Sequence, residues 1–180
     1  MRKYIENLFY LLLLFIFIVG CSQTRQITIS STIPVAMQQL IKSTKVEDVD
    51  YSFKPNPLAE LCKYDFTYGG LTVNNELNIN YSIEPLLIEL IQTKFSKIDK
   101  SSPNKVYVKI SDIDCDEGNA TLKLFIDVEI TQNNKTSSKK LAYSMVFPYT
   151  SSEQPDAIHS FLMKFVIGVD KFIDNEFDVQ

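Results

Sequence analysis

The sequence is poor in the residue types that usually build catalytic and nucleotide-binding sites. Its 180 residues include no tryptophan, a single histidine and only five glycines. A Ser-His-Asp or Cys-His arrangement would need His159 as its base, but this residue follows Ile158 in a helical apolar pattern, which favours a partly exposed helix-surface position. The sequence has neither a Gly-x-Ser-x-Gly elbow nor a glycine-rich phosphate loop. We therefore expect no enzymatic activity and no cofactor. An envelope hydrolase that uses scattered carboxylates is the weaker alternative.

The chain also lacks the positive charge that nucleic-acid binding requires. Its formal net charge is -4 at pH 7, whereas a protein that binds a phosphate backbone needs a basic face. We therefore expect no nucleic-acid partner. With 45% hydrophobic and 22% charged residues, its usage is ordinary for a globular domain. This composition excludes disorder of the whole chain.

The strongest pattern lies at the N-terminus. Arg2 and Lys3 precede an unbroken apolar run from Leu8 to Val19. This run is short of the roughly 20 residues that a membrane-spanning helix needs, and the layout is typical of a secretory signal. The alternative is a transmembrane anchor with an incidental cysteine.

The run ends in Ile18-Val19-Gly20-Cys21, which resembles the lipobox of bacterial lipoproteins. The resemblance implies cleavage before Cys21, a diacylglyceryl group on its thiol and acylation of its new amino group. Several acyl chains on one residue hold a protein stably at a membrane. The next residue is Ser22 rather than Asp, which in the enteric members of the class implies an outer-membrane address. We expect a domain that faces the periplasm.

The remaining sequence predicts a tether followed by one domain. Residues 1–20 are the signal peptide, and 21–57 are the lipidated Cys21 and a polar tether with a short helix over 35–42. Pro55 and Pro57 block regular structure at the end of the tether. The globular domain is expected over 58–180.

Periodicity within 58–180 predicts an α+β fold. Alternation of apolar and polar residues predicts strands at 62–68, 106–111, 122–130 and 141–147, and a hairpin over 71–79. Helical spacing predicts two amphipathic helices, one with Ser82 as its N-cap and one capped by Asp156. The order is strand–helix–strand–strand–strand–helix. We expect two layers, an antiparallel sheet of three to five strands with both helices on one face.

This element order, together with the anchor, resembles periplasmic accessory lipoproteins. The similar classes are the lipopolysaccharide-assembly lipoprotein, the auxiliary lipoproteins of ABC-type lipid transporters and the lipoprotein activators of peptidoglycan synthases. No motif within 58–180 is shared with them. The resemblance therefore implies a class of location and no particular activity.

Cys62 and Cys115 form an even pair in an oxidising compartment. They are either joined in a disulfide or are two buried free thiols, and the sequence leaves both alternatives open. Two distant cysteines and one histidine do not make a zinc site. Asp112, Asp114 and Asp116 have a faint likeness to a calcium loop, but their predicted flanks are strands, so we expect no metal and a solvated turn.

The same turn contains Asn119 in the sequence Glu117-Gly118-Asn119-Ala120-Thr121. An Asn-x-Thr sequon with an acidic residue two positions before the asparagine resembles the bacterial N-glycosylation acceptor, so Asn119 is a candidate glycosylation site. A set of aromatic residues precedes it in the chain and is either a docking surface or, as we favour, partly the inward face of the first strand. The set comprises Tyr51, Phe53, Tyr64, Phe66 and Tyr68.

Two functions are consistent with these features. The first is an outer-membrane-anchored lipoprotein that acts as a non-enzymatic accessory or assembly component of a cell-envelope complex. It predicts an exposed apolar patch or an unpaired strand edge. The alternative is a periplasmic carrier of lipid or another small molecule, which would need a cavity between the helices and the sheet.

Overall fold

The computed structural model describes residues 22–68, 71–116, 118–148, 150 and 152–177. The signal peptide, Cys21 and the Gly69-Gly70 pair lie outside the described residues. The described elements are, in order, β1 Ser22–Gln26, α2 Val35–Gln38, β2 Asp48–Lys54, the 3-10 helix η1 Pro57–Ala59, β3 Cys62–Tyr68, β4 Leu71–Leu77, α3 Ile79–Lys94, β5 Lys97–Ile98, β6 Lys105–Asp116, β7 Thr121–Gln132, β8 Lys135–Val146 and α4 Gln154–Glu176.

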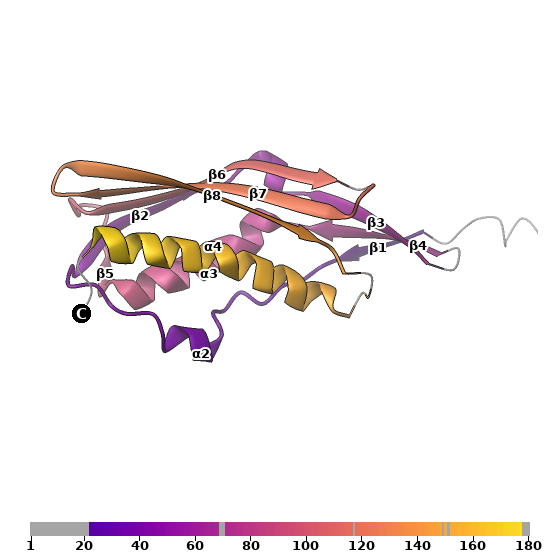
Figure 1. The fold of residues 1–180 in the computed structure, drawn as a ribbon, viewed down its shortest axis with the longest axis horizontal. Coiled ribbons are helices and arrows are strands. Elements are labelled where there is room, and N and C mark those ends of the chain that lie inside the picture. Colours follow the sequence, from indigo (N-terminus) through magenta and orange to yellow (C-terminus); the bar gives the residue numbers. More distant parts are fainter. Residues whose placement is uncertain (1–21, 69–70, 117, 149, 151, 178–180) are drawn as a thin grey trace, which may run out of the picture.

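The strands form two sheets. One has three strands in the order β1-β4-β3, and the other has five in the order β5-β2-β6-β7-β8. Helices α3 and α4 lie side by side along one face of the large sheet, and the small sheet extends beyond them along the long axis (Figure 1). The predicted α+β fold with two helices on one face is thus confirmed. The sheets are mixed rather than purely antiparallel, since β1–β4, β2–β5 and β2–β6 are parallel pairs.

The core lies between the large sheet and the two helices. Alternate residues of β7 point inward and are at most 1% exposed, from Leu122 to Ile130. The inward stripe of α4, which includes Ile158, Leu162 and Phe165, is equally buried. At Gly168 a Cβ atom would lie 2.9 Å from a methyl carbon of Leu141 on β8. The absence of a side chain in mid-helix therefore lets α4 approach the sheet closely, which offsets the helix-propensity cost of glycine.

The predicted tether is part of the fold. β1 pairs with β4 along all five of its residues, and β2 lies between β5 and β6 in the large sheet. Between them, the segment 27–47, which we call the arm, runs along the side of the helices that faces away from the sheet (Figure 1). Ile27, Ile29 and Ile33 of the arm are buried. The prediction of a tether over 21–57 was therefore wrong for its described residues. β1 carries no apolar alternation, and the alternation of Val49, Tyr51 and Phe53 in β2 was not recognised as a strand.

Both helices begin earlier than their sequence signals indicated. The N-cap of α3 is Asn78, whose side chain accepts a hydrogen bond from the backbone N–H of Tyr81 at 2.9 Å, so Ser82 lies within the helix. Pro85 is therefore inside α3. The N-cap position of α4 is Glu153, and Asp156 lies in the first turn, where its charge favours the helix dipole without capping it.

The hairpin expected over 71–79 was also wrong. β4 is one continuous strand through Asn74 and Asn75, and it pairs with β3 instead. β7 and β8 are joined by a turn at Asn133 and Asn134, with φ angles of 52° and 61°. Asparagine tolerates this left-handed conformation, and two such residues make the tight turn that matches strand twist.

Candidate functional site

A surface groove of about 610 Å³ lies where the arm passes the small sheet and the start of α3. Its walls come from three segments that are distant in sequence: the end of β1 with the start of the arm, the η1–β3 turn, and the β4–α3 junction. The lining residues are Gln26, Ile27, Thr28, Ile29, Ser31, Glu60, Leu61, Glu76, Leu77, Asn78, Tyr81, Ser82 and Pro85. We call this feature the arm groove.

The rim of the arm groove exposes large apolar side chains. Tyr81 is 80% exposed and Leu61 is 50% exposed, and Leu58 on the neighbouring η1 turn is 71% exposed. Single exposed apolar residues are normal on a protein surface, whereas several beside a groove make a candidate interaction site. Tyrosine and leucine in this setting offer apolar contact area, and the tyrosine hydroxyl adds a polar end.

Paired hydrogen bonds hold the two sides of this rim together. The side chain of Asn80, at the start of α3, accepts from the backbone N–H of Asn56 at 3.1 Å and donates to its carbonyl at 2.8 Å. Asn80 is only 7% exposed. Because both backbone groups of Asn56 are satisfied by one rigid side chain, η1 and α3 keep a fixed relative position, and the rim is preorganised.

The polar groups of the arm groove come from a small number of side chains. They are carboxylates and amides with hydroxyls, and Glu76 is paired with Lys63 at 3.3 Å. His159 is not part of the groove lining, and its Nε2 lies 3.0 Å from the carbonyl oxygen of Thr32 in the arm. An apolar groove with a few fixed polar groups is the usual form of a ligand or peptide site.

The acidic residues of the predicted calcium-like loop lie on and beside the β6–β7 hairpin. Asp114 pairs with Lys123 at 3.0 Å, and Asp116 accepts from the backbone and side-chain nitrogens of Asn119 at 3.1 and 2.7 Å. The side-chain bond from Asn119 is the main cause that lowers the pKa of Asp116. Over the described residues, no group of three or more histidine, cysteine, aspartate or glutamate side chains is placed to hold a metal ion.

The candidate acceptor Asn119 is exposed in this hairpin turn. Its amide nitrogen is engaged by Asp116, as described above, while Glu117 lies outside the described residues. The turn position is the kind of place that a glycosylation site requires. Modification of Asn119 stays a prediction.

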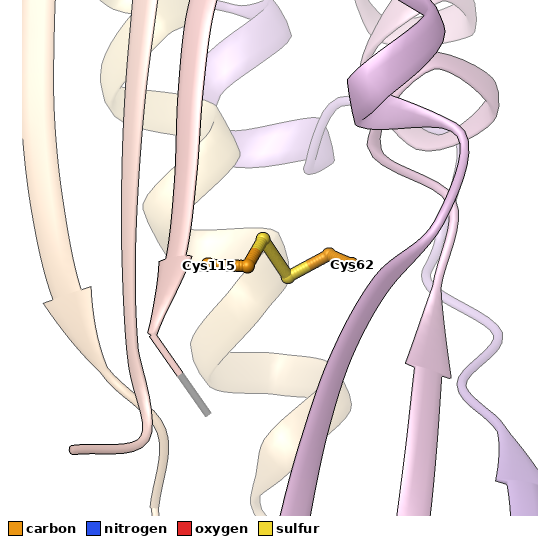
Figure 2. Close-up of a disulfide and its surroundings, with 2 residues drawn as sticks. All are labelled: Cys62 and Cys115. Atoms are coloured by element: carbon orange, nitrogen blue, oxygen red, sulfur yellow. A yellow bond between two sulfur atoms is a disulfide. The ribbon is translucent and has the colours of Figure 1, made fainter. Parts of the chain in front are cut away.

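Cys62 and Cys115 are joined in a disulfide, which decides between the two alternatives left by the sequence. Figure 2 shows the bond linking β3 of the small sheet to the end of β6 in the large sheet. Their Cα atoms are 5.8 Å apart, and the separation along the chain is 53 residues. The disulfide therefore fixes the small sheet, and with it one wall of the arm groove, to the main body of the domain.

A bulge in β6 brings Cys115 to the inside. Before it, Val108 and Ile110 face the core; the register with β7 then shifts between Ile110 and Asp112, leaving Ser111 as the extra residue. After the bulge the odd-numbered residues pair with inward positions of β7, so Cys115 is opposite Leu122. An uninterrupted alternation would have placed Asp112 and Asp114 inside.

The aromatic set is divided between core and surface. Tyr64 is fully buried and stacks on Phe147 with ring centroids 3.6 Å apart, and Tyr51 is 7% exposed. Burial raises the pKa of both tyrosines. The inward interpretation of the strand 62–68 is confirmed for Tyr64, whereas the side chains of Phe66 and Tyr68 lie outside the described residues.

A buried ion cluster connects the helices. The Lys94 side chain of α3 is fully buried and is paired with two aspartates of α4. They are Asp174 and, at 2.7 Å, Asp170, one helical turn before Asp174. The backbone carbonyl of Lys94 also accepts from the N–H of Thr44 at 2.9 Å. The cluster joins α3, α4 and the arm, and we assign it a structural role.

Sequence reasoning did not find the arm groove. Its apolar residues come from segments that lie far apart along the chain, and Ile27 and Ile29 lie in the stretch that was expected to be a solvated tether. Tyr81 precedes the position expected to start the helix. No local signal joins these segments, because only the parallel pairing of β1 with β4 brings them together.

Comparison with known proteins supports the fold and carries no function. No family model and no curated protein matches the chain. The crystal structure of protein XCC0632 from Xanthomonas campestris, assigned to DUF330, is similar, with a TM-score of 0.54, 8% sequence identity and coverage of 86% of this chain and 99% of that chain. An uncharacterized protein of known structure has a TM-score of 0.52, 6% identity and the same coverages. At such low identity the likeness shows the fold alone. Within the described part of the chain, neither long helix is apolar enough to cross a membrane.

Proposed function

We propose that this chain is an outer-membrane-anchored lipoprotein, lipidated on Cys21 and facing the periplasm. In this proposal it is a non-enzymatic accessory component of a cell-envelope complex. The observation that carries the accessory role is the preorganised apolar rim of the arm groove, formed by Leu61 and Tyr81. The lipobox-like Ile18-Val19-Gly20-Cys21 supports the anchor.

The arm groove supports protein docking through its shape and its rigidity. A partner that inserts an apolar side chain beside Tyr81 would bury a surface that now faces water, which stabilises a complex by about 25 cal/mol per Å² of apolar area. The rim is held by the Asn80–Asn56 hydrogen bonds and the disulfide. A binding surface that is already ordered loses little entropy when the partner binds.

The experiment that tests this role is site-specific photo-cross-linking in the native cell. A photoreactive amino acid replaces Tyr81 in one strain and the exposed Thr136, on β8, in a matched control strain. We expect a specific envelope protein to be captured from position 81 and not from position 136. Capture should be lost in a Cys21→Ala form, which would not be anchored. Equal capture from the two positions, or none from position 81, would overturn the docking role.

A second function is supported by the size of the groove. Its volume of about 610 Å³ lies within the range of roughly 300–1,000 Å³ that is typical of small-molecule sites. A carrier of lipid or a small molecule would then hold its ligand in the arm groove rather than between helices and sheet, where the cavity was expected. Native mass spectrometry of the protein extracted from its membrane would show a bound mass that Leu61→Glu removes. A spectrum without added mass counts against the carrier.

A further inference from the structure

No linker residue separates Cys21 from the first strand of the domain. β1 begins at Ser22, and it pairs with β4 from Ser22–Thr72 through Gln26–Glu76. A flexible tether over 22–57 would have let the domain range over roughly 35 Å. A strand that is hydrogen-bonded from its first residue instead fixes the anchor point relative to the sheet. An acyl-bearing residue immediately before β1 would therefore keep the start of this strand close to the membrane surface.

The parallel pairing also determines which end of the domain is next to the anchor. Because Ser22 is opposite Thr72 and Tyr68 is opposite Leu71, the start of β1 lies beside the end of β3 and the start of β4. This end of the small sheet extends beyond the helices and the large sheet, whereas the β7–β8 turn lies at the opposite end of the molecule (Figure 1). Nothing else in the described fold reaches as far toward the anchor.

The rows of the small sheet nearest this end contain no charged residue. They are the Tyr68–Leu71 pair, the row Thr67–Thr72–Ser22 and the row Phe66–Val73–Gln23. The first charged residue, Asp65, occurs in the fourth row. At about 3.3 Å per residue the three rows span roughly 7 Å, which matches the polar headgroup layer of about 5–7 Å on each side of a bilayer.

We infer that this uncharged end of the small sheet, at residues 66–68, 71–73 and 22–23, is a membrane-contact surface that seats in the headgroup layer of the bilayer holding the lipid anchor. The inference rests on the lipidation proposed above. It makes the small sheet a rigid spacer. Gln26, the first residue of the arm groove, then stands about 13 Å beyond Ser22 along the strand. The groove faces its partner at a fixed, short distance from the lipid surface.

The natural sequence has no tryptophan, so the fluorescence of a single introduced tryptophan reports the position of that residue relative to the bilayer. The lipidated full chain is purified from membranes as Tyr68→Trp or as Lys135→Trp, the latter at the far end beside the β7–β8 turn. Each is reconstituted into phosphatidylethanolamine–phosphatidylglycerol vesicles with or without a lipid that carries a nitroxide on its headgroup, which quenches tryptophan at the depth of the headgroup layer. Leu71→Trp provides a second label in the same row if Tyr68→Trp does not fold.

We expect the headgroup-nitroxide lipid to remove most of the emission of Tyr68→Trp and to leave that of Lys135→Trp unchanged. The mass of each sample shows whether Cys21 carries acyl chains. Acylated protein with equal quenching at both ends, or with none at either, overturns the membrane-contact surface and leaves the anchored lipoprotein in place. Protein without acyl chains at Cys21 overturns the anchor and the inference together.

Discussion

At the scale of single residues, Lys94 is a buried charge that depends on its two partners. Its ammonium group has no exposed surface, while its partners Asp170 and Asp174 keep 19% and 32% of theirs. The two sides of this cluster are therefore unequal. A partly exposed carboxylate that loses its partner can turn toward water. A buried ammonium group that loses its partners cannot reach water and stays unsolvated.

This asymmetry predicts the outcome of opposite substitutions. The double substitution Asp170→Asn and Asp174→Asn leaves the cation buried and unpaired, and we expect it to cost about 3–5 kcal/mol of unfolding free energy. Lys94→Met keeps the volume and removes the charge, so it should cost clearly less. Urea unfolding of the three proteins measures the difference. A larger loss in Lys94→Met than in the double variant would contradict the assignment.

A second residue-scale prediction concerns the bulge at Ser111. Removing this residue leaves the pairs Ile110–Ile126 and Asp112–Phe125 adjacent in a regular ladder. We therefore expect the Ser111 deletion to keep the Cys62–Cys115 disulfide. Deleting Asp114 instead either turns Cys115 outward or carries Asp112 into the core, and both are costly. Thiol titration of the oxidised proteins distinguishes the two deletions. Loss of the disulfide in the Ser111 deletion would show that the bulge itself is required.

At the scale of elements, α3 holds the arm in place. The carboxylate of Glu89 accepts from the backbone N–H of Ile33 and from the side-chain amide of Gln38, both at 2.6 Å. Hydrogen bonds to a charged acceptor each contribute about 1.5–3 kcal/mol. Glu89 thus holds the arm in place. The arm forms one wall of the arm groove and connects β1 to β2 of the large sheet.

Removing this carboxylate should loosen the arm without unfolding the core. We expect Glu89→Ala to increase amide hydrogen exchange over residues 27–47 while β7 and α4 stay protected. Glu84→Ala, at an exposed position of the same helix, is the matched control and should leave exchange unchanged. The assignment fails if the two variants exchange alike.

The elements also show how far sequence patterns extend. Each of β6, β7, α3 and α4 buries one face in the same core. Their apolar residues therefore recur at a regular spacing, and this periodicity predicted the four elements. β1 was missed because its residues, Ser-Gln-Thr-Arg-Gln, carry no apolar face. The arm groove was missed for the same reason, since it depends on where that polar strand pairs. Asn78 was passed over as a cap because Ser82 sits closer to the apolar stripe.

At the scale of the whole molecule, the disulfide determines whether the two sheets act as one body. It closes a loop between residues 53 positions apart, and a loop of that size corresponds to about 4 kcal/mol of stabilisation by the chain-entropy model. We expect the double variant Cys62→Ala and Cys115→Ala to lose stability of this order in urea. We also expect faster exchange in β3 and β4 than in β7. Uniform loss of protection across both sheets would show that the bond stabilises the domain without joining two bodies.

The orientation inferred for the domain leads to the last prediction, which tests the molecule as a whole. A Gly/Ser insertion of about twelve residues between Cys21 and Ser22 leaves every described contact intact. It replaces a fixed link by one with a typical reach of about 20 Å. If the arm groove binds a membrane-bound partner at a fixed distance from the bilayer, the longer linker lowers the effective concentration of the groove at that partner. Photo-cross-linking from position 81 should then decrease, although acylation, the disulfide and the melting temperature are unchanged.

The same insertion between Asn133 and Asn134 is the matched control, because it adds equal length at the end of the domain opposite the anchor. We expect it to leave cross-linking at the level of the natural chain. If both insertions lower the yield equally, the loss reflects a general disturbance rather than height. An undiminished yield with the linker after Cys21 would mean that the partner reaches the groove from solution. The short polar strand β1 would then serve only to close the small sheet.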